Sequence, residues 1–173
     1  MTFVRISGAL AALLLASGFA YAQGKPTDPQ IAHIAYTAGQ LDIEAAHQAL
    51  QKSSNKEVRA FATDMERDHK AVNDKALALV KKLNVTPEDN DTSKALTKQA
   101  ADKRAELAKL SGAAFDRAYI DNEVAYHKVV NGALEKTLIP SASKPELKDL
   151  LTTGLKIFEG HEQHAEHVAA EFK

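Results

Sequence analysis

The sequence predicts an all-α fold, a four-helix bundle built from two antiparallel hairpins that a long crossover joins. Apolar residues recur at steps of three and four along four long segments, the spacing of helices that pack side by side. The five prolines fall near expected helix starts or in connections. No segment alternates apolar and polar residues for long enough to predict a strand.

Capping signals set the expected helix boundaries. Asp28-Pro29 predicts a first helix over residues 28–52, with an N-cap followed by a first-turn proline. The capping-box pattern that starts at Ser54 predicts a second helix over 54–83. A shorter amphipathic helix is expected over 92–110. Ser111 is placed to cap a helix over 112–138, and a second capping box at Ser143 predicts the last helix over 143–172.

The connections predict how these helices pair. The turn at Ser53-Ser54 is short and makes the first two helices antiparallel, and the turn over 139–143 does the same for the last two. Between the pairs lies a long connection, residues 84–111, that holds the short extra helix. This arrangement is the ferritin-like topology.

Residues 1–22 have the pattern of a cleaved secretory signal. Arg5 precedes an apolar run, and Ala20-Tyr21-Ala22 puts small residues where a signal peptidase reads them. The run is shorter and more broken than a membrane anchor, and a chain without cysteine has no lipoprotein anchor. We therefore expect residues 23–173 to form a single domain that is periplasmic or secreted and has no membrane span.

Composition excludes several functions. A formal net charge of −1 argues against a nucleic-acid partner, which needs a basic surplus. The absence of cysteine removes thiol nucleophiles, thiolate zinc sites and iron–sulfur clusters. Any chemistry must then come from histidine, carboxylate and tyrosine side chains.

Three histidines occupy positions where the helical periodicity predicts an apolar residue. His69, His127 and His161 each interrupt the apolar stripe of a different helix. A single core histidine is usually structural, but three on three helices favour a shared site, and buried neutral imidazoles are good metal ligands. Glycine destabilises a helix, so Gly132, Gly154 and Gly160 indicate either a close approach of two backbones or a local opening beside His161.

Acidic residues are spaced to join these histidines. Glu66 precedes His69 in a Glu-x-x-His step, which places both on one helical face, and Glu123 stands one turn before His127. The full candidate metal-ligand set is Glu44, Glu66, His69, Asp116, Glu123, His127, His161 and His164. The last helix lacks the Glu-x-x-His step of a di-iron centre, so a single His/carboxylate-bound divalent ion (Fe, Zn, Mn or Cu) is expected. The alternative is a buried polar network that only fixes helix register.

Several strings together resemble one known group. The segments Asn55-Lys-Glu-Val-Arg-Ala-Phe-Ala62, Asp68-His69, Phe115-Asp116-Arg-Ala-Tyr119, Tyr126-His127 and His161-Glu-Gln-His-Ala165 resemble the domain-of-unknown-function-4142 family. The resemblance covers about residues 30–172. It implies an exported bacterial protein with a ferritin-like helical bundle, and it matches Glu44, His69, Asp116, His127 and His161 to the family's polar positions. It implies no established activity.

Two functions follow from these patterns. The first is a non-catalytic binding or stress-related envelope protein whose His/carboxylate cluster holds a metal ion. The second is a metal-dependent oxidase or peroxide-handling enzyme that uses the same cluster. An open coordination position would favour the enzyme, and a saturated site would favour the binding protein.

Overall fold

The computed structural model describes residues 24–172, and within that range the regular structure is entirely helical. The expected signal segment, residues 1–22, lies outside the described residues. The five long helices are α1 (Asp28–Lys52), α2 (Lys56–Lys82), α3 (Asp91–Ala108), α4 (Gly112–Ala133) and α6 (Pro145–Glu171). None of these helices is both long enough and apolar enough to cross a membrane. The all-α prediction is confirmed.

The helix boundaries agree with the prediction to within about two residues at most ends, but several caps differ. Thr27, rather than Asp28, caps α1 in a capping box with Gln30. Asn55, rather than Ser54, caps α2. Ser111 precedes α4 as expected but makes no side-chain capping hydrogen bond. These neighbouring polar residues compete for the same orphan N–H groups, and local backbone geometry decides which one reaches them.

The second predicted capping box does not form, because Ser143 bonds to the start of α1 instead. The buried carboxylate of Asp28 accepts hydrogen bonds from the Ser143 backbone N–H (2.8 Å), the Ser143 hydroxyl and the Lys144 backbone N–H (3.2 Å). The helix α6 therefore begins at Pro145 without a side-chain cap. Asp28 acts as a tether between two elements distant in sequence.

The helix predicted over 112–138 is a regular α-helix only as far as Ala133. After α4 the chain forms a π-helical turn, η1 (Leu134–Leu138), and then the short α5 (Ile139–Ser141). Pro140 lies in α5 and has no N–H to donate to the carbonyl four residues earlier, which explains why regular α-helical bonding is not continued here.

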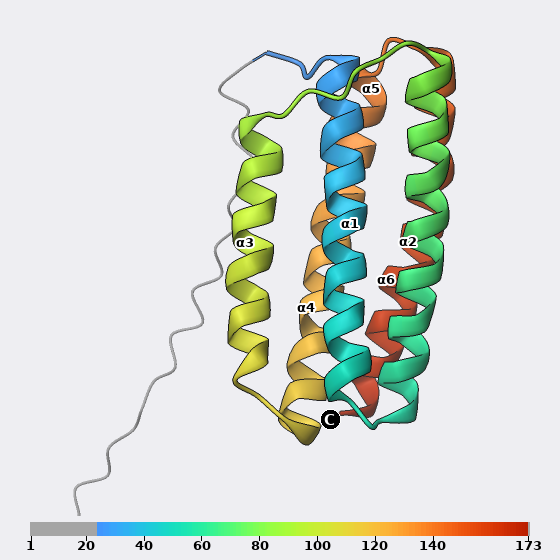
Figure 1. The fold of residues 1–173 in the computed structure, drawn as a ribbon. Helices are drawn as coiled ribbons and strands as arrows, with labels where there is room; N and C mark the ends of the chain where they lie inside the picture. Colours follow the sequence, from blue (N-terminus) through green and yellow to red (C-terminus); the bar gives the residue numbers. More distant parts are fainter. Residues whose placement is uncertain (1–23, 173) are drawn as a thin grey trace, which may run out of the picture.

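The long helices run side by side (Figure 1). The main contacts join α1 with α2 and α4 with α6, and both pairs are antiparallel, as the short turns predict. Contacts of α2 with α6, and weaker contacts of α1 with α4, hold the pairs together. The crossover helix α3 packs mainly on α1, on the outside of this group.

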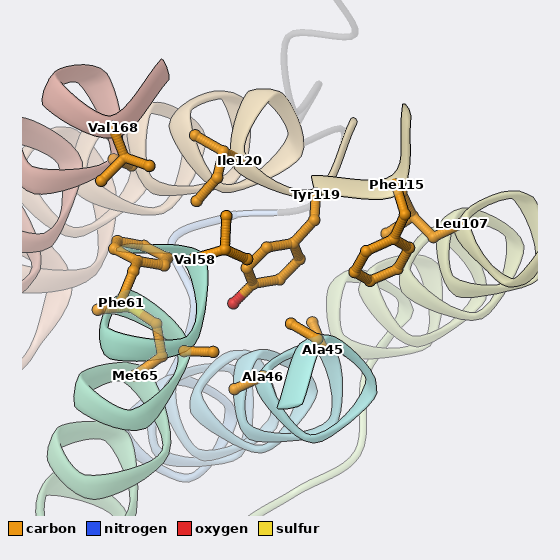
Figure 2. Close-up of a cluster of buried hydrophobic side chains, with 13 residues drawn as sticks. Ala45, Ala46, Val58, Phe61, Met65, Leu107, Phe115, Tyr119, Ile120 and Val168 are labelled. Carbon is orange, nitrogen blue, oxygen red and sulfur yellow. The ribbon is translucent and has the colours of Figure 1, made fainter. Parts of the chain in front are cut away.

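Two hydrophobic clusters fill the interior. One is centred on Phe61, Phe115 and Tyr119, near the turn between α1 and α2 (Figure 2). The other gathers apolar residues toward the opposite end, among them Ile31, Leu134, Leu147, Leu151 and Phe158. Helical periodicity predicts an apolar stripe on α6 through Leu147, Leu151, Gly154, Phe158, His161, Ala165, Val168 and Phe172, and all of these are buried except Phe172, which is partly buried.

Candidate metal centre

A layer of buried polar side chains separates the two hydrophobic clusters. Along each of the helices α1, α2, α4 and α6, the buried residues change from one cluster to the other at a polar position. These positions are Asp42 on α1, His69 on α2, Glu123 and His127 on α4, and His161 on α6. All five are buried. The two hairpins therefore align at the level of their polar residues, and this alignment is one that the sequence does not determine.

The three histidines predicted from the apolar stripes meet in this layer. The His69, His127 and His161 ring centroids lie 5.3 to 5.7 Å apart. Each ring offers a nitrogen within 4.8 Å of the others, and none of the three side chains is exposed. His69 also stacks on Phe158, with ring centroids 4.4 Å apart and planes at 10°, which fixes its orientation.

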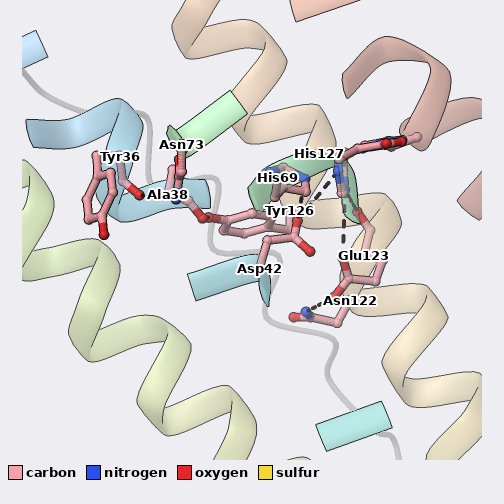
Figure 3. A network of polar contacts seen from close by, with 11 residues as sticks. Tyr36, Ala38, Asp42, His69, Asn73, Asn122, Glu123, Tyr126 and His127 are labelled. Carbon is pink, nitrogen blue, oxygen red and sulfur yellow. Dashed lines mark hydrogen bonds and ion pairs between the residues drawn. The ribbon is translucent and has the colours of Figure 1, made fainter. Parts of the chain in front are cut away.

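The hydrogen bond of His127 determines its tautomer. Its Nδ1 lies 3.0 Å from the backbone carbonyl of Glu123, and a carbonyl only accepts, so Nδ1 carries the proton. The lone pair is then on Nε2, which is buried, forms no hydrogen bond and lies 3.5 Å from Asp42 Oδ2 (Figure 3). His127 is oriented as metal-binding histidines are, with one nitrogen anchored and the other free.

His161 is held in a similar way from the other side. Its Nε2 donates to Asp68 Oδ2 at 3.1 Å, which leaves Nδ1 buried with no hydrogen-bond partner. Asp68 is itself fixed by Arg67, whose Nε lies 2.7 Å from Asp68 Oδ1. A carboxylate behind an imidazole orients the ring and makes it a better ligand.

Asp42 is the carboxylate that faces these rings. Its Oδ2 lies 3.2 Å from His69 Nε2, yet the two atoms do not form a hydrogen bond, and both carboxyl oxygens of Asp42 are without one. Glu123 lies next to it with Oε2 likewise unpartnered, so that Asp42, Glu123 and His127 form a second group of converging ligand atoms. Buried polar atoms are nearly always satisfied, so this concentration of unpaired acceptors needs an explanation.

Burial controls the protonation of the whole layer. It lowers the pKa of His127 to about 4, and it lowers the pKa of His69 and of His161, so the three imidazoles are neutral near pH 7. Burial also raises the pKa of Asp42 to about 8. The pKa of Glu123 is raised well above its usual range by burial and by the neighbouring Asp42. Neutral imidazoles beside destabilised carboxylates are a favourable environment for a cation.

The other predicted ligands do not join the layer. Glu44 lies two residues from Asp42, about 200° around the helix, and pairs instead with Arg104 at 2.8 Å. Glu66 pairs with His47 at 3.0 Å on a half-exposed surface. His164 lies against the Phe61 ring, with Asp64 Oδ2 4.0 Å from its Nδ1. Asp116 is buried on α4, but it stands about 16 Å along the helix from His127.

The sequence analysis missed Asp42 and the role of Asp68. A signal for Asp42 was present, because it lies four residues after Ala38 and three before Ala45, on the small-residue face of α1. Periodicity predicts an apolar stripe on α1 through Ile31, Ala38, Leu41 and Ala45, and on a helix dense in alanine it does not resolve Leu41 from its neighbour Asp42. Asp68 lies next to His69 in sequence but reaches His161 on α6, a contact that only packing creates.

An all-helical protein with a buried His/carboxylate layer is therefore the class that fold and site define. The model of the DUF4142 family, a domain of unknown function, matches residues 16–168, and the chain belongs to this family. No curated protein matches it.

Two solved structures share the fold at low sequence identity. A DUF305 fragment from Deinococcus radiodurans has a TM-score of 0.69 at 14% identity, covering 86% of this chain and 99% of its own. A DUF305 protein from Streptomyces coelicolor, provisionally described as secreted, has a TM-score of 0.70 at 13% identity, covering 83% of this chain and 91% of its own. At such identities the likeness concerns the fold alone.

Proposed function

We propose that the protein binds one divalent transition-metal ion in the polar layer, through His69, His127, His161 and Asp42. The carrying observation is that buried polar groups without hydrogen bonds lie together: His69, His127 and His161 each offer a nitrogen within 4.8 Å of the other two, and Asp42 Oδ2 lies 3.2 and 3.5 Å from His69 Nε2 and His127 Nε2. An ion placed among them would satisfy all four at once and compensate the buried carboxylate.

The distances support a small tetrahedral site. Metal–nitrogen bonds of about 2.0–2.1 Å in a tetrahedron put neighbouring ligand atoms roughly 3.3 Å apart. The distances from Asp42 Oδ2 to His69 Nε2 and to His127 Nε2, 3.2 and 3.5 Å, are close to that edge. One ring nitrogen of each histidine lies within 4.8 Å of the other two, and Asp42, Glu123 and His127 form a second such group that shares His127, so one ion would draw the two groups together.

The donor set narrows the choice of ion. Three imidazoles and one carboxylate suit zinc, copper(II) or iron(II) better than magnesium or calcium, which prefer oxygen. A site of four protein ligands would be closed, and a closed site favours metal holding over catalysis. We further propose that the chain has the ferritin-like bundle topology and is exported as a periplasmic or secreted protein, as the sequence of residues 1–22 predicts.

Metal titration of the chelator-treated protein tests the proposal. We expect isothermal titration calorimetry to show one equivalent of zinc or copper(II) bound, with iron(II), under anaerobic conditions, and manganese(II) compared in parallel. At a metal concentration of 100 times Kd the protein gains about 2.7 kcal/mol of stability, which raises Tm by roughly 5–10 °C for a domain of this size.

Matched variants separate this site from surface histidines. His127→Gln should abolish the binding heat and the thermal shift, whereas His167→Gln, on the exposed face of α6, should leave both unchanged. Asp68→Ala should weaken binding by about 10–100-fold because it frees the His161 ring, with Asp64→Ala as the control. Absence of stoichiometric binding for all four metals, or equal binding by the two histidine variants, would overturn the proposal.

A further inference from the structure

An apolar cavity lies directly against the polar layer, on the side of the second hydrophobic cluster. Its volume is about 60 Å³, and residues of α1, α2, α3, α4, η1 and α6 line it. The rings of His69 and His127 contribute to its wall at the polar layer, and Leu134, Leu138, Leu147 and Leu151 line it toward the other end. The cavity thus connects the candidate metal centre with the apolar core.

Small side chains leave this space open. Residues of this kind occur on all four principal helices around the cavity: Ala35, Ala38, Gly39, Ala76, Ala133 and Gly154. Close packing does not require glycine at position 154, since an added Cβ would meet Phe158 at 3.4 Å and Val72 at 3.9 Å, both ordinary contacts. Tight helix crossing at Gly154 therefore does not account for the cavity. The sequence analysis indicated a local opening near this glycine as one of two alternatives.

No charged residue lines the cavity, and its buried polar wall atoms without hydrogen bonds are ring nitrogens of His69 and His127, at the end next to the polar layer. The Tyr126 hydroxyl donates to the backbone carbonyl of Ala38 at 2.8 Å. The Asn73 side-chain amide donates to the carbonyl of Tyr36 at 3.3 Å. The Nε2 atoms of His69 and His127 lie close to Asp42. A buried water needs two to four polar partners, and the end of the cavity lined by Leu134, Leu138, Leu147 and Leu151 offers none.

The size of the cavity limits what can occupy it. One water needs about 10–15 Å³ measured in this way, and an engineered apolar cavity of about 150 Å³ holds benzene or xenon. A space of about 60 Å³ therefore accepts a molecule of a few atoms and excludes an aromatic ring or a lipid chain.

We propose that this cavity binds a small, uncharged, apolar gas molecule of the size of dioxygen or nitric oxide and holds it beside His69 and His127. This site goes beyond metal binding and does not depend on it, because the walls that form it belong to the helices themselves. With an ion bound to the histidines, the gas molecule would lie next to the ion.

Dioxygen itself serves as the probe. In the metal-free protein, kept in chelator, dissolved dioxygen under pressure should enhance the relaxation of methyl groups of Leu134 and Leu151 several-fold more than those of Val58 and Val168, which are also buried, in the other cluster. Equal enhancement in both clusters would overturn the proposal. Because no metal is present, this result is independent of whether the metal site exists.

Cavity-filling variants localise the effect. Ala76→Leu and Ala35→Leu project a larger side chain from half-buried wall positions, and each should remove the enhancement at Leu134 and Leu151. Ala118→Leu, partly buried against the other cluster, should leave the enhancement unchanged.

Crystals of the unmodified protein pressurised with xenon give a check that does not depend on variant folding. A xenon atom between His69 and Leu151 supports the proposal, and a cavity without xenon or filled by ordered water refutes it.

Discussion

Asp42 offers the sharpest test of the buried layer, because its burial should destabilise the metal-free protein. The change is Asp42→Asn, which keeps the shape of the side chain and removes its ability to ionise. We expect the variant to be more stable than the unmodified protein in the absence of metal, and to lose metal affinity. A metal-binding carboxylate that is buried without its ion lowers the stability of the fold. Its replacement by a neutral side chain therefore stabilises the metal-free protein and weakens metal binding.

The magnitude follows from the pKa of Asp42. The carboxyl has a pKa of 3.8 in its ordinary state and about 8 in this fold. At pH 7 the unfolded chain carries the ionised form and the folded chain the protonated form, so the unfolded state binds fewer protons and stability falls as pH rises above 3.8. At about 1.4 kcal/mol per pH unit the cost reaches at most about 4 kcal/mol at pH 7. Asparagine, neutral at every pH, avoids this cost.

Urea unfolding in chelator at pH 4.5, 6, 7 and 8 measures the difference between the two proteins. The advantage of Asp42→Asn should grow across this range and level off near pH 8, and the histidines, which both proteins share, largely cancel in the comparison. Asp74→Asn, at an exposed position, should show no such growth. An advantage that stays constant within about 0.5 kcal/mol from pH 4.5 to 8 would refute the reasoning that Asp42 is buried without a partner.

Three other changes probe the histidines, the helix packing and the tether of α1. Below pH 6.5 the unfolded chain protonates His127, which burial keeps neutral in the fold, so the stability of the metal-free protein relative to His127→Gln should fall between pH 6.5 and about 4, as followed by urea unfolding. Gly132→Ala should raise the free energy of unfolding by about 0.5–1 kcal/mol, because a Cβ there meets nothing within 4 Å. Gly39→Ala should lack this gain, because its Cβ would lie 2.5 Å from Asn73 Oδ1; equal thermal melts for the two glycine variants would contradict this packing. Asp28→Ala should cost about 2–3 kcal/mol by losing hydrogen bonds from Ser143 and Lys144, whereas Asp149→Ala, at an exposed position, should be neutral in the same melts.

The histidines of the candidate site could be predicted because they break a regular pattern. His69, His127 and His161 stand at positions of the apolar stripes, and the predicted stripe of α6 is buried except for its last residue, Phe172, which is partly buried. The carboxylates could not be chosen in this way. Glu44 and Glu66 have ligand-like spacing, but spacing within one helix does not determine which neighbour a surface side chain meets, and both pair with basic groups outside the layer.

Periodicity and the short turns by themselves determined where the helices lie and their antiparallel pairing, because these depend on contacts between residues close in sequence. Only the tertiary structure decided that the two hairpins align in depth, so that Asp42 from one meets His127 from the other and Asp68 reaches His161. That alignment depends on long-range packing of two hydrophobic clusters on either side of the polar layer. No local rule encodes it, since a shift of one helical turn between the hairpins would leave every stripe and every cap intact.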